Sequence, residues 1–551
     1  MRRLGEVLTD EQMATDQQIE LALKEQRSTG ELLGNVLLRL GIVNRKELSR
    51  AVAISNDLPF VDLKTTFVEP AAVKLVDKSF AERYRLMPYA VEGENLKVAM
   101  DNPSDVVAID GLRRLVKQPL MIYAADLESV METIEFQYGL GASIDEEVSR
   151  NMAAALSGGG VAEGEVEPPV IRLLELFFIK AIRDRATDIH MSPEEMVTRI
   201  SFRVDGIMRG EYVMARSIHI PLITRIKVLS GMNIAENRLP QDGQLQFAFS
   251  GRSVDIRSSL IPTKFGENAV LRILDKTSVA QGLESLGMSL ELRRKIERLI
   301  RIPFGIVLAA GPTGSGKTTT LYAMLRLVNA LEKNVLTIED PIEYQMPLIK
   351  QSQVNKKIDF GFPQAIRHFL RQDPDIILVG EIRDLETTEM ALQAAMTGHL
   401  VLSTIHTNDA PSTIARLLDL GVEPYLLPST LKAVVAQRLV RRICTNCKEE
   451  YHLSAAEIEE LGFSGWLQPA DSLFRGRGCE LCGESGYHGR LGIYEIMTVG
   501  PDLGELVSTK ASIKAIKEQA IAEGMVTMLE YGLDQVKTGI TTIDEITRVT
   551  Q

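Results

Sequence analysis

The chain has 551 residues, of which 45% are hydrophobic and 25% charged, and its formal net charge is −12. This length exceeds what one hydrophobic core usually serves and predicts roughly two to four domains, and the ordinary composition excludes disordered and collagen-like chains. The acidic balance argues against nucleic acid as a partner of the whole protein and against direct binding to anionic lipid.

The first 60 residues contain an internal repeat with an offset of 29 residues, in which Leu4-Gly5 is echoed by Leu33-Gly34. Apolar residues three and four apart in each copy predict a helix, a turn and a second helix. From Val61 to about Tyr138, strand patterns such as Leu96–Met100 alternate with helical ones such as Val106–Leu115, which predicts a small α/β unit. We therefore expect an N-terminal module over residues 1–140.

Three further segments follow this module. Residues 141–169 carry a glycine triplet, several acidic residues and two prolines, which indicates a flexible linker. Residues 170–285 mix helical patterns with strands such as Thr198–Val204 and predict a second α/β domain. In residues 286–551, strands and helices alternate regularly, the signature of a parallel, doubly wound sheet, and the stretch from Thr509 is helical in pattern.

We expect no signal peptide, because the first residues contain no apolar core of the required length. The N-terminus begins with a charged amphipathic stretch, and nowhere do about 18 apolar residues run together. We expect a cytoplasmic protein whose membrane contact is indirect, through a partner.

The segment from Gly311 to Thr318 reads GPTGSGKT and matches the P-loop pattern in full. It follows the predicted strand Ile306–Ala310 and opens the predicted helix Thr319–Val328, which is the context the motif needs. The glycines let several backbone N–H groups point at phosphates, Lys317 should contact the β/γ oxygens, and Thr318 should ligate Mg²⁺. The pattern therefore predicts ATP binding rather than an ordinary glycine-rich turn. The expected nucleotide contacts are Gly311, Pro312, Thr313, Gly314, Ser315, Gly316, Lys317, Thr318 and Thr319.

Ionisable residues follow three successive predicted strands beyond the P-loop: Glu343 after the first, Glu381 after the second and His406 after the third. One such residue alone is typical of a helix N-cap or a solvated turn. Three such residues after a P-loop indicate that they lie together at one edge of a sheet and complete a hydrolytic site. Because Gly380, and not an aspartate, precedes Glu381, Mg²⁺ would rest mainly on Thr318, phosphate oxygens and waters, so hydrolysis should be slow.

These motifs resemble the secretion ATPases of type II secretion and type IV pili, and the resemblance covers nearly the whole chain. It rests on the P-loop, an aspartate box (Thr337–Tyr344), an atypical Walker B motif (Ile377–Asp384), a histidine box (Thr397–Asn408) and the flanking motifs at residues 202–206, 238–243, 254–257, 436–442 and 489–495. It implies a homo-hexameric ring with ATP between a RecA-like C-terminal domain and a PAS-like domain that precedes it.

The same resemblance implies the roles of site residues. Glu343 would be the general base for water, Glu381 would support Mg²⁺ and water, and His406 would sense the γ-phosphate. Arginines of the PAS-like domain would reach the phosphates on closure. The candidates are Arg257 and Arg272, followed by Arg203 and Arg238, with pairing to acidic neighbours such as Asp205 or Asp255 as the alternative for each.

All four cysteines lie in two Cys-x-x-Cys pairs, Cys444/Cys447 and Cys479/Cys482, separated by 31 residues. Two such turns make a closed tetrahedral S₄ site, which suits structural zinc and leaves no open position for catalysis. A redox dithiol and free structural thiols are the alternatives. The resemblance agrees with a zinc insert over residues 444–482, because assembly ATPases of this family often carry a tetracysteine that retraction ATPases lack.

The N-terminal repeat resembles the tandem motif of the family's cyclic di-GMP-binding module. The first copy has Gln12 where the motif has glycine, and the second has Leu32 and Ser55 in place of arginine and glutamine. The motif residues that remain are Arg3, Leu4, Gly5, Gln26, Gly34 and Gly41. Since the lost groups are those that would stack on or bond guanine, a docking module is favoured over a cyclic di-GMP sensor.

The expected fold class is α/β multidomain: a helical N-terminal module with a small α/β unit, a PAS-like α/β domain, and a RecA-like P-loop core with a tetracysteine zinc insert and a helical C-terminus. The resemblance implies an ATPase that acts through an inner-membrane platform protein and an accessory docking protein. We favour type IV pilus extension, on the run from His406 to Pro411, over type II secretion and over a weakly active ATP-binding scaffold. DNA translocation is disfavoured because nothing basic and aromatic marks a strand-binding channel.

Overall fold

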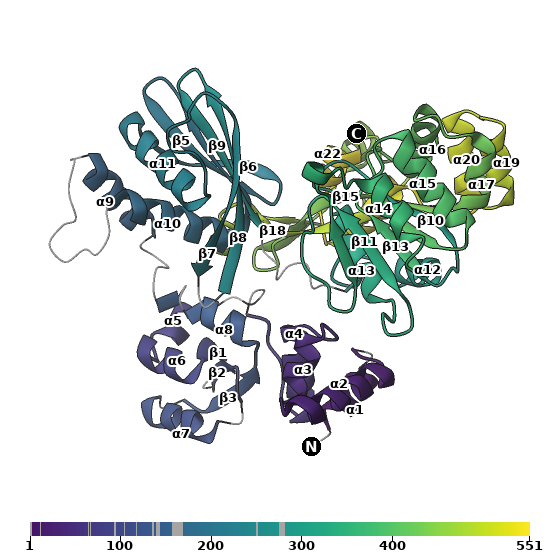
Figure 1. Ribbon diagram of the computed structural model, residues 1–551. Helices are drawn as coiled ribbons and strands as arrows, with labels where there is room; N and C mark the ends of the chain where they lie inside the picture. Colours follow the sequence, from purple (N-terminus) through teal and green to yellow (C-terminus); the bar gives the residue numbers. More distant parts are fainter. Residues whose placement is uncertain are drawn as a thin grey trace. The chain divides into compact units, whose positions relative to one another are not determined.

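The computed structural model describes residues 3–11, 13–63, 66, 68–92, 95–103, 105–116, 118–134, 137–138, 144–156, 169–249, 252–274 and 282–550 (Figure 1). The chain divides into two compact units, Met1–Lys276 and Thr277–Gln551. None of the helices in the described ranges combines the length and the apolar character that a membrane span requires.

The N-terminal repeat folds as two copies of a short helix followed by a longer one, which confirms the predicted pattern. The helices are α1 (Leu4–Asp10), α2 (Asp16–Thr29), α3 (Leu33–Arg39) and α4 (Arg45–Ser55). Thr15 and Asn44 stand at equivalent positions of the two copies and each closes a capping box at the start of the longer helix. Equivalent apolar residues, such as Leu8 and Leu37, are fully buried in one shared core.

The predicted small α/β unit has a three-stranded sheet in the order β1-β2-β3. Its elements are α5 (Pro70–Val73), α6 (Lys78–Tyr84), β1 (Leu86–Glu92), β2 (Asn95–Met100), α7 (Val106–Leu115), β3 (Leu120–Ala124) and α8 (Leu127–Ile134). Strands β2 and β3 are parallel, joined through α7. Alternate residues of β2 belong to two different apolar clusters, as Val98 and Ala99 do, because successive strand side chains point to opposite faces.

Helix α9 (Ile144–Leu156) occupies part of the segment predicted as a linker, so that prediction is wrong for residues 144–156. The helix buries Ile144 and Val148 in the same apolar core as α10 (Pro169–Arg183). Ion pairs join the two helices as well, at 2.9 Å between Glu147 and Arg172 and at 3.1 Å between Asp145 and Lys180. Of the rest of the predicted linker, Pro169 begins α10, and residues 141–143 and 157–168 lie outside the described residues.

The remainder of the first unit is an antiparallel sheet in the order β6-β5-β4-β9-β8-β7, packed against α10 and α11 (Figure 1). Its elements are β4 (Ala186–Pro193), β5 (Val197–Val204), β6 (Ile207–Ala215), α11 (His219–Leu229), β7 (Gln241–Phe249), β8 (Arg252–Thr263) and β9 (Gly266–Leu274). Phe177 and Phe178 of α10 and Phe202 of β5 are almost completely buried in the core between helices and sheet.

The second unit is built on a seven-stranded sheet in the order β12-β11-β13-β14-β10-β15-β18. All neighbouring pairs are parallel except β15 and β18, so the predicted parallel sheet is confirmed and gains one antiparallel edge strand. The strands are β10 (Gly305–Ala310), β11 (Val335–Glu339), β12 (Lys350–Gln353), β13 (Ile376–Val379), β14 (Leu400–Ile405), β15 (Leu431–Ile443) and β18 (Tyr487–Thr498). The connecting helices are α12 (Leu290–Ile300), α13 (Lys317–Arg326), α14 (Phe362–Phe369), α15 (Leu385–Met396), α16 (Ala410–Asp419) and α17 (Leu427–Thr430).

The boundary between the units precedes the one predicted at residue 285. Leu283 is buried in the core of the second unit, and the carbonyl of Leu286 accepts a hydrogen bond from Gly492 N–H at 3.0 Å. The described residues 282–285 therefore belong with the second unit, because their apolar contacts lie there.

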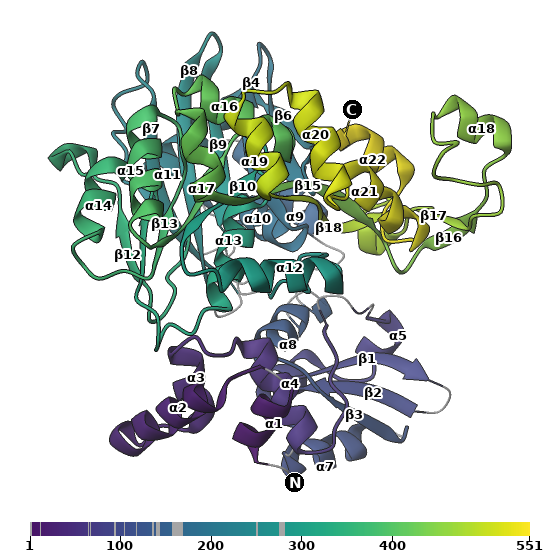
Figure 2. The ribbon, with the colours of Figure 1, turned by 90° about the vertical axis from the view of Figure 1, so that its right-hand side faces the viewer.

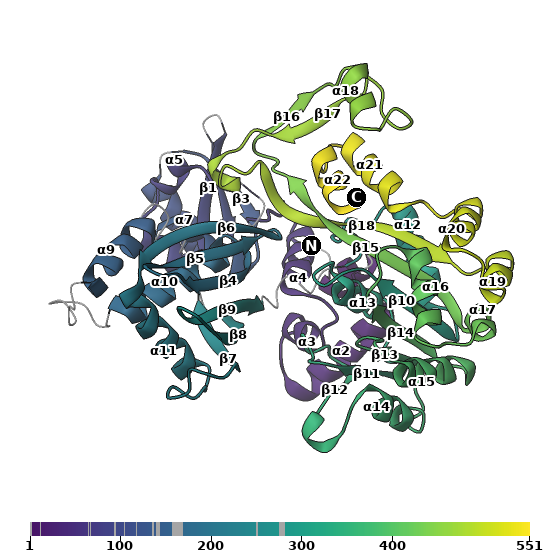
Figure 3. The ribbon, with the colours of Figure 1, turned by 90° about the horizontal axis from the view of Figure 1, so that it is seen from above.

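An arm formed by residues 448–478 projects from the second unit beside the C-terminal helices (Figures 2 and 3). It consists of β16 (Lys448–Tyr451), α18 (Ala455–Glu460) and β17 (Leu473–Gly476). The C-terminal helices are α19 (Pro501–Ser508), α20 (Ile513–Ala522), α21 (Met528–Lys537) and α22 (Ile543–Thr550). The arm lies against α21, where Asp471 and Lys537 approach to 3.9 Å.

Candidate functional site

The carboxyl ends of four neighbouring parallel strands, β11, β13, β14 and β10, meet at one edge of the second sheet. Backbone hydrogen bonds join the segments that follow them. Gly311 N–H donates to the carbonyl of Ile405 at 3.3 Å, and Ile382 N–H donates to the carbonyl of Thr404 at 2.9 Å. The topology thus brings together the loops that carry Lys317, Glu381 and His406, as sequence order alone indicated.

The P-loop itself has the backbone shape that phosphate binding requires. Gly314 and Gly316 have φ angles of 79° and 87°, in the left-handed region that favours glycine. Gly316 is the N-cap of α13, which begins at Lys317, two residues before the predicted start. The free N–H groups of the first turn of α13 therefore face the loop, and Thr318 is exposed on that turn.

Lys317 is buried, and its ammonium group is held by the P-loop itself. Nζ donates to the carbonyls of Gly311 at 2.7 Å and Pro312 at 2.9 Å. Burial lowers the pKa of Lys317 to about 8; the charge of Glu381 opposes this shift and that of Arg438 adds to it. Phosphate oxygens would be stronger acceptors than these two carbonyls for the same ammonium group.

Glu381 and His406 form a small polar cluster beside the P-loop. The carboxylate of Glu381 pairs with Arg383 at 2.6 Å, and its Oε2 lies 3.7 Å from His406 Nε2. Burial lowers the pKa of His406, the charge of Lys317 acts in the same direction, and Glu381 opposes both. A neutral imidazole near pH 7 follows, which can both donate and accept a hydrogen bond.

The end of β11 carries a buried carboxylate that was not among the predicted site residues. Glu339 is 3% exposed and accepts hydrogen bonds from the Tyr322 hydroxyl, from Thr337 Oγ1 at 2.6 Å and from Gln351 Nε2 at 3.1 Å. It ties helix α13 to β11 behind the P-loop. The predicted base, Glu343, lies four residues further on, partly exposed in the loop after β11.

The four arginines predicted to reach phosphate lie in the first unit, and three of them share one row of its sheet. Arg203, Arg272 and Arg257 stand on β5, β9 and β8, with Asp188 of β4 opposite both Arg203 and Arg272. The Asp188 carboxylate is 3.6 Å from Arg203 and 2.9 Å from Arg272. The predicted pairing with an acidic neighbour is therefore present for Arg203 and Arg272, and the carboxylate is that of Asp188.

The fourth arginine, Arg238, has an 84% exposed side chain that pairs with Glu236 at 3.2 Å. This pair lies in the segment between α11 and β7.

The four cysteines form one cluster at the base of the arm. Sγ–Sγ distances are 3.8 Å for Cys444 and Cys479, 3.9 Å for Cys447 and Cys482, and 3.7 Å for Cys479 and Cys482. Four thiolates at about 2.3 Å from one tetrahedral zinc ion would be spaced by about 3.8 Å, whereas a disulfide needs about 2.05 Å. The donor set and its spacing fit structural zinc and do not fit a disulfide.

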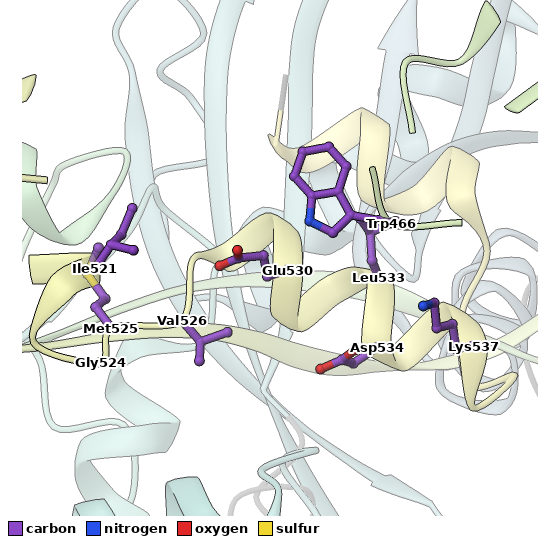
Figure 4. Close-up of a pocket in the computed structure, with 9 residues that line it drawn as sticks. All are labelled: Trp466, Ile521, Gly524, Met525, Val526, Glu530, Leu533, Asp534 and Lys537. Atoms are coloured by element: carbon purple, nitrogen blue, oxygen red, sulfur yellow. The ribbon is translucent and has the colours of Figure 1, made fainter. Parts of the chain in front are cut away.

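A pocket of about 360 Å³ lies between the arm and the C-terminal helices, and its lining residues are Trp466, Ile521, Gly524, Met525, Val526, Glu530, Leu533, Asp534 and Lys537 (Figure 4). Among its polar residues, Glu530 is already engaged in capping α21 through Thr527. None of the P-loop residues lines this pocket, so it is separate from the predicted nucleotide site.

Comparison with known proteins identifies several similar chains. Residues 163–548 match the family described as Type II/IV secretion system protein, and residues 56–143 match the MshEN domain. The type IV pilus assembly ATPase PilB of Myxococcus xanthus is 38% identical over 560 residues, which cover 99% of this chain and 98% of that protein. The type II secretion system protein HxcR of Pseudomonas aeruginosa is 47% identical over 383 residues, 70% of this chain and 78% of that protein. Among solved structures, the Legionella pneumophila ATPase DotB has a similar fold, with a TM-score of 0.51, 19% identity, and coverage of 69% of this chain and 95% of that one.

Proposed function

The chain belongs to the type II/IV secretion system protein family, and we propose that within it this ATPase powers type IV pilus extension. The observation that supports the choice is the extent of the match to the pilus assembly ATPase of M. xanthus, which covers 99% of this chain, against 88% for the type II secretion system ATPase E of Vibrio cholerae. The match to HxcR is higher in identity but covers 70% of this chain. Type II secretion, with pseudopilus assembly and exoprotein export, is therefore the second candidate.

The residues at the sheet edge can perform ATP hydrolysis in defined roles. The P-loop amides and Lys317 hold the β- and γ-phosphates, and Lys317 exchanges its two carbonyl acceptors for phosphate oxygens. Thr318 would hold Mg²⁺, which would neutralise charge on the phosphates. Glu343 takes the proton of the attacking water, and Glu381 would help to position Mg²⁺ and that water. His406 senses the γ-phosphate through hydrogen bonding by its neutral imidazole.

Arginines of the PAS-like domain complete the site in this proposal. Arg203, Arg257 and Arg272 stand in one row around Asp188, so Asp188 holds two of these guanidinium groups in place before the nucleotide arrives. A phosphate would compete with Asp188 for the same donors. Closure of the domain on the nucleotide would then couple hydrolysis to motion, and Arg238 is the further candidate.

The zinc insert has a structural role. Zinc bound by Cys444, Cys447, Cys479 and Cys482 would join both ends of the arm at one point, because the two cysteine pairs flank residues 448–478. Its coordination is complete with four sulfurs, so no water or substrate would bind the metal.

The N-terminal module serves docking in this proposal. The MshEN match over residues 56–143 supports a regulatory or docking region, whereas Leu32 and Ser55 replace polar groups that guanine would need. Calorimetric titration of the full chain with cyclic di-GMP tests this assignment. We expect no heat of binding at cyclic di-GMP concentrations of roughly tens of micromolar. Saturable binding in that range would show that the module is a cyclic di-GMP sensor and not only a docking module.

We further propose that the working form is a homo-hexamer, cytoplasmic and peripheral to the inner membrane, that engages a platform protein and an accessory docking protein. Native mass spectrometry with and without Mg²⁺ and ATP checks the oligomer. Phosphate release by the purified protein checks turnover, with Glu343→Gln as the variant that should bind ATP without hydrolysing it. Equal turnover by wild type and Glu343→Gln would reject this site, and no turnover by the wild type would favour the scaffold alternative.

A further inference from the structure

Arg438 lies on β15 where that strand runs past the end of β10. The two strands are parallel with Ala436 opposite Ala310, so Gln437 and Arg438 come level with the start of the P-loop. Gln437 is 1% exposed, and its Nε2 donates to the carbonyl of Ser315 at 2.6 Å. This buried bond fixes this part of β15 against the P-loop.

Within the described part of the chain, the guanidinium of Arg438 has no carboxylate at ion-pair distance. Its hydrogen bonds go to uncharged acceptors, the carbonyl of Gln437 at 3.3 Å and Oδ1 of Asn408 at 3.3 Å. Asn408 stands two residues beyond His406, in the loop that also borders the P-loop. A partly buried arginine that contacts only uncharged groups has unused capacity to bind an anion.

Asp409 and Glu495, whose charges act on Arg438, both accept hydrogen bonds from backbone groups. Asp409 caps α16 by accepting from Ser412 N–H at 2.8 Å. Glu495 is 2% exposed and accepts from Ala410 N–H at 2.8 Å and from Met528 N–H at 3.2 Å. Asp409 Oδ1 and both oxygens of Glu495 thus accept from backbone N–H groups, and neither carboxylate forms an ion pair with Arg438 in the described residues.

Lys317 is a second cation of this region, and the charge of Arg438 contributes to the lowered pKa of Lys317. Both groups are partly removed from water and hydrogen-bonded to neutral oxygens. A ligand with several negatively charged oxygens between them would satisfy both at once.

We infer that Arg438 is a nucleotide-binding residue that contacts the polyphosphate of ATP from the same chain, beside Lys317. This assignment rests on the proposed ATPase function and adds a binding group to it. It differs from the arginines of the PAS-like domain in that it is in place before any domain closes. Because Arg438 comes level with the P-loop, whose lysine is expected at the β/γ oxygens, it should distinguish ATP and ADP from AMP.

The test compares full-length Arg438→Gln, which loses the charge, with Arg438→Lys, which keeps it. Arg442→Gln is the matched control, because Arg442 is an exposed residue of the same strand. Affinities for ATP, ADP and AMP with Mg²⁺ are measured by calorimetry, alongside melting temperature and zinc content. We expect Arg438→Gln to bind ATP and ADP at least ~10-fold more weakly and AMP within ~2-fold of wild type. Arg438→Lys should keep most of the affinity.

Three results would overturn the assignment. They are wild-type affinity of Arg438→Gln for ATP and ADP, an equal loss for AMP, and an equal loss in Arg442→Gln. If Arg438→Gln melts earlier or loses zinc, the neutral variant Arg438→Met is measured in its place. Loss of the ATP-over-AMP preference in a stable Arg438→Met supports the assignment, and an unchanged preference opposes it. A wild-type protein that binds neither ATP nor ADP contradicts the proposed ATPase function instead.

Discussion

Glu545 is the carboxylate that joins the C-terminal helix α22 to β15, and removing its charge should destabilise the second unit. Its side chain is 1% exposed and accepts four hydrogen bonds, two from Arg441 and two from Arg548, at 2.7–2.9 Å. Burial raises the pKa of Glu545, but the bonds from Arg548 and Arg441 outweigh it and lower the pKa from 4.5 to about 2. A difference of that size corresponds to about 3 kcal/mol of folding free energy at pH 7.

The substitution Glu545→Gln keeps the shape but loses the charge, so we expect it to lower the free energy of unfolding by about 3 kcal/mol. Urea unfolding followed by tryptophan fluorescence measures this, because Trp466 is the only tryptophan of the chain and lies in the arm against α21. The midpoint should fall by about 1 M. Glu518→Gln is the control, because Glu518 and its partner Lys514 are 67% and 85% exposed, and it should cost less than about 0.5 kcal/mol.

The pH dependence provides a second check on the same carboxylate. A lowered pKa in the folded state stabilises the protein above the unfolded pKa, and the stabilisation is lost as the pH falls from about 4.5 to about 2. The advantage of wild type over Glu545→Gln should therefore be full at pH 7 and shrink by roughly half at pH 3. Equal midpoints for the two proteins at pH 7 would refute the reasoning.

Three other outcomes are expected. Lys317→Ala should abolish measurable ATP binding in calorimetry, since the ammonium group is held at the P-loop carbonyls where phosphate oxygens would bind; ATP affinity within ~3-fold of wild type would contradict that role. Glu381→Gln should bind ATP but release phosphate at least ~100-fold more slowly, and ordinary turnover would remove Glu381 from the mechanism. Cys444→Ser should lose zinc, measured by a metal-sensitive dye, and lower the melting temperature while ADP affinity stays unchanged; wild-type zinc content would rule out the S₄ site.

Local patterns in the sequence predicted the features that depend on neighbouring residues. The P-loop, the two cysteine pairs and the helical repeat each consist of residues whose spacing alone determines the local geometry. The sequence also predicted that Glu381 and His406 lie close together, because the carboxyl ends of parallel strands lie at one edge of the sheet. In the structure the two side chains are 3.7 Å apart.

The remaining features depend on contacts between distant parts of the chain. Gln437 reaches Ser315 only because β15 pairs with β10. The sequence of a strand does not reveal which strand lies beside it in the sheet. Asp188 lies between Arg203 and Arg272 for the same reason. We did not predict helix α9, because the glycines and prolines around it indicate a linker. The helix has only a short apolar stripe, and packing of this stripe against α10 stabilises it.

The most direct test of the account is deletion of the gene in its source organism, followed by complementation with wild type or with Lys317→Ala. Surface pili are counted by electron microscopy, and exported proteins are compared in the culture medium. We predict that pili disappear, that exoproteins stay at wild-type levels, and that only the wild-type gene restores pili. Pili that persist in the deletion strain, together with loss of exoproteins, would contradict pilus extension and assign the ATPase to type II secretion.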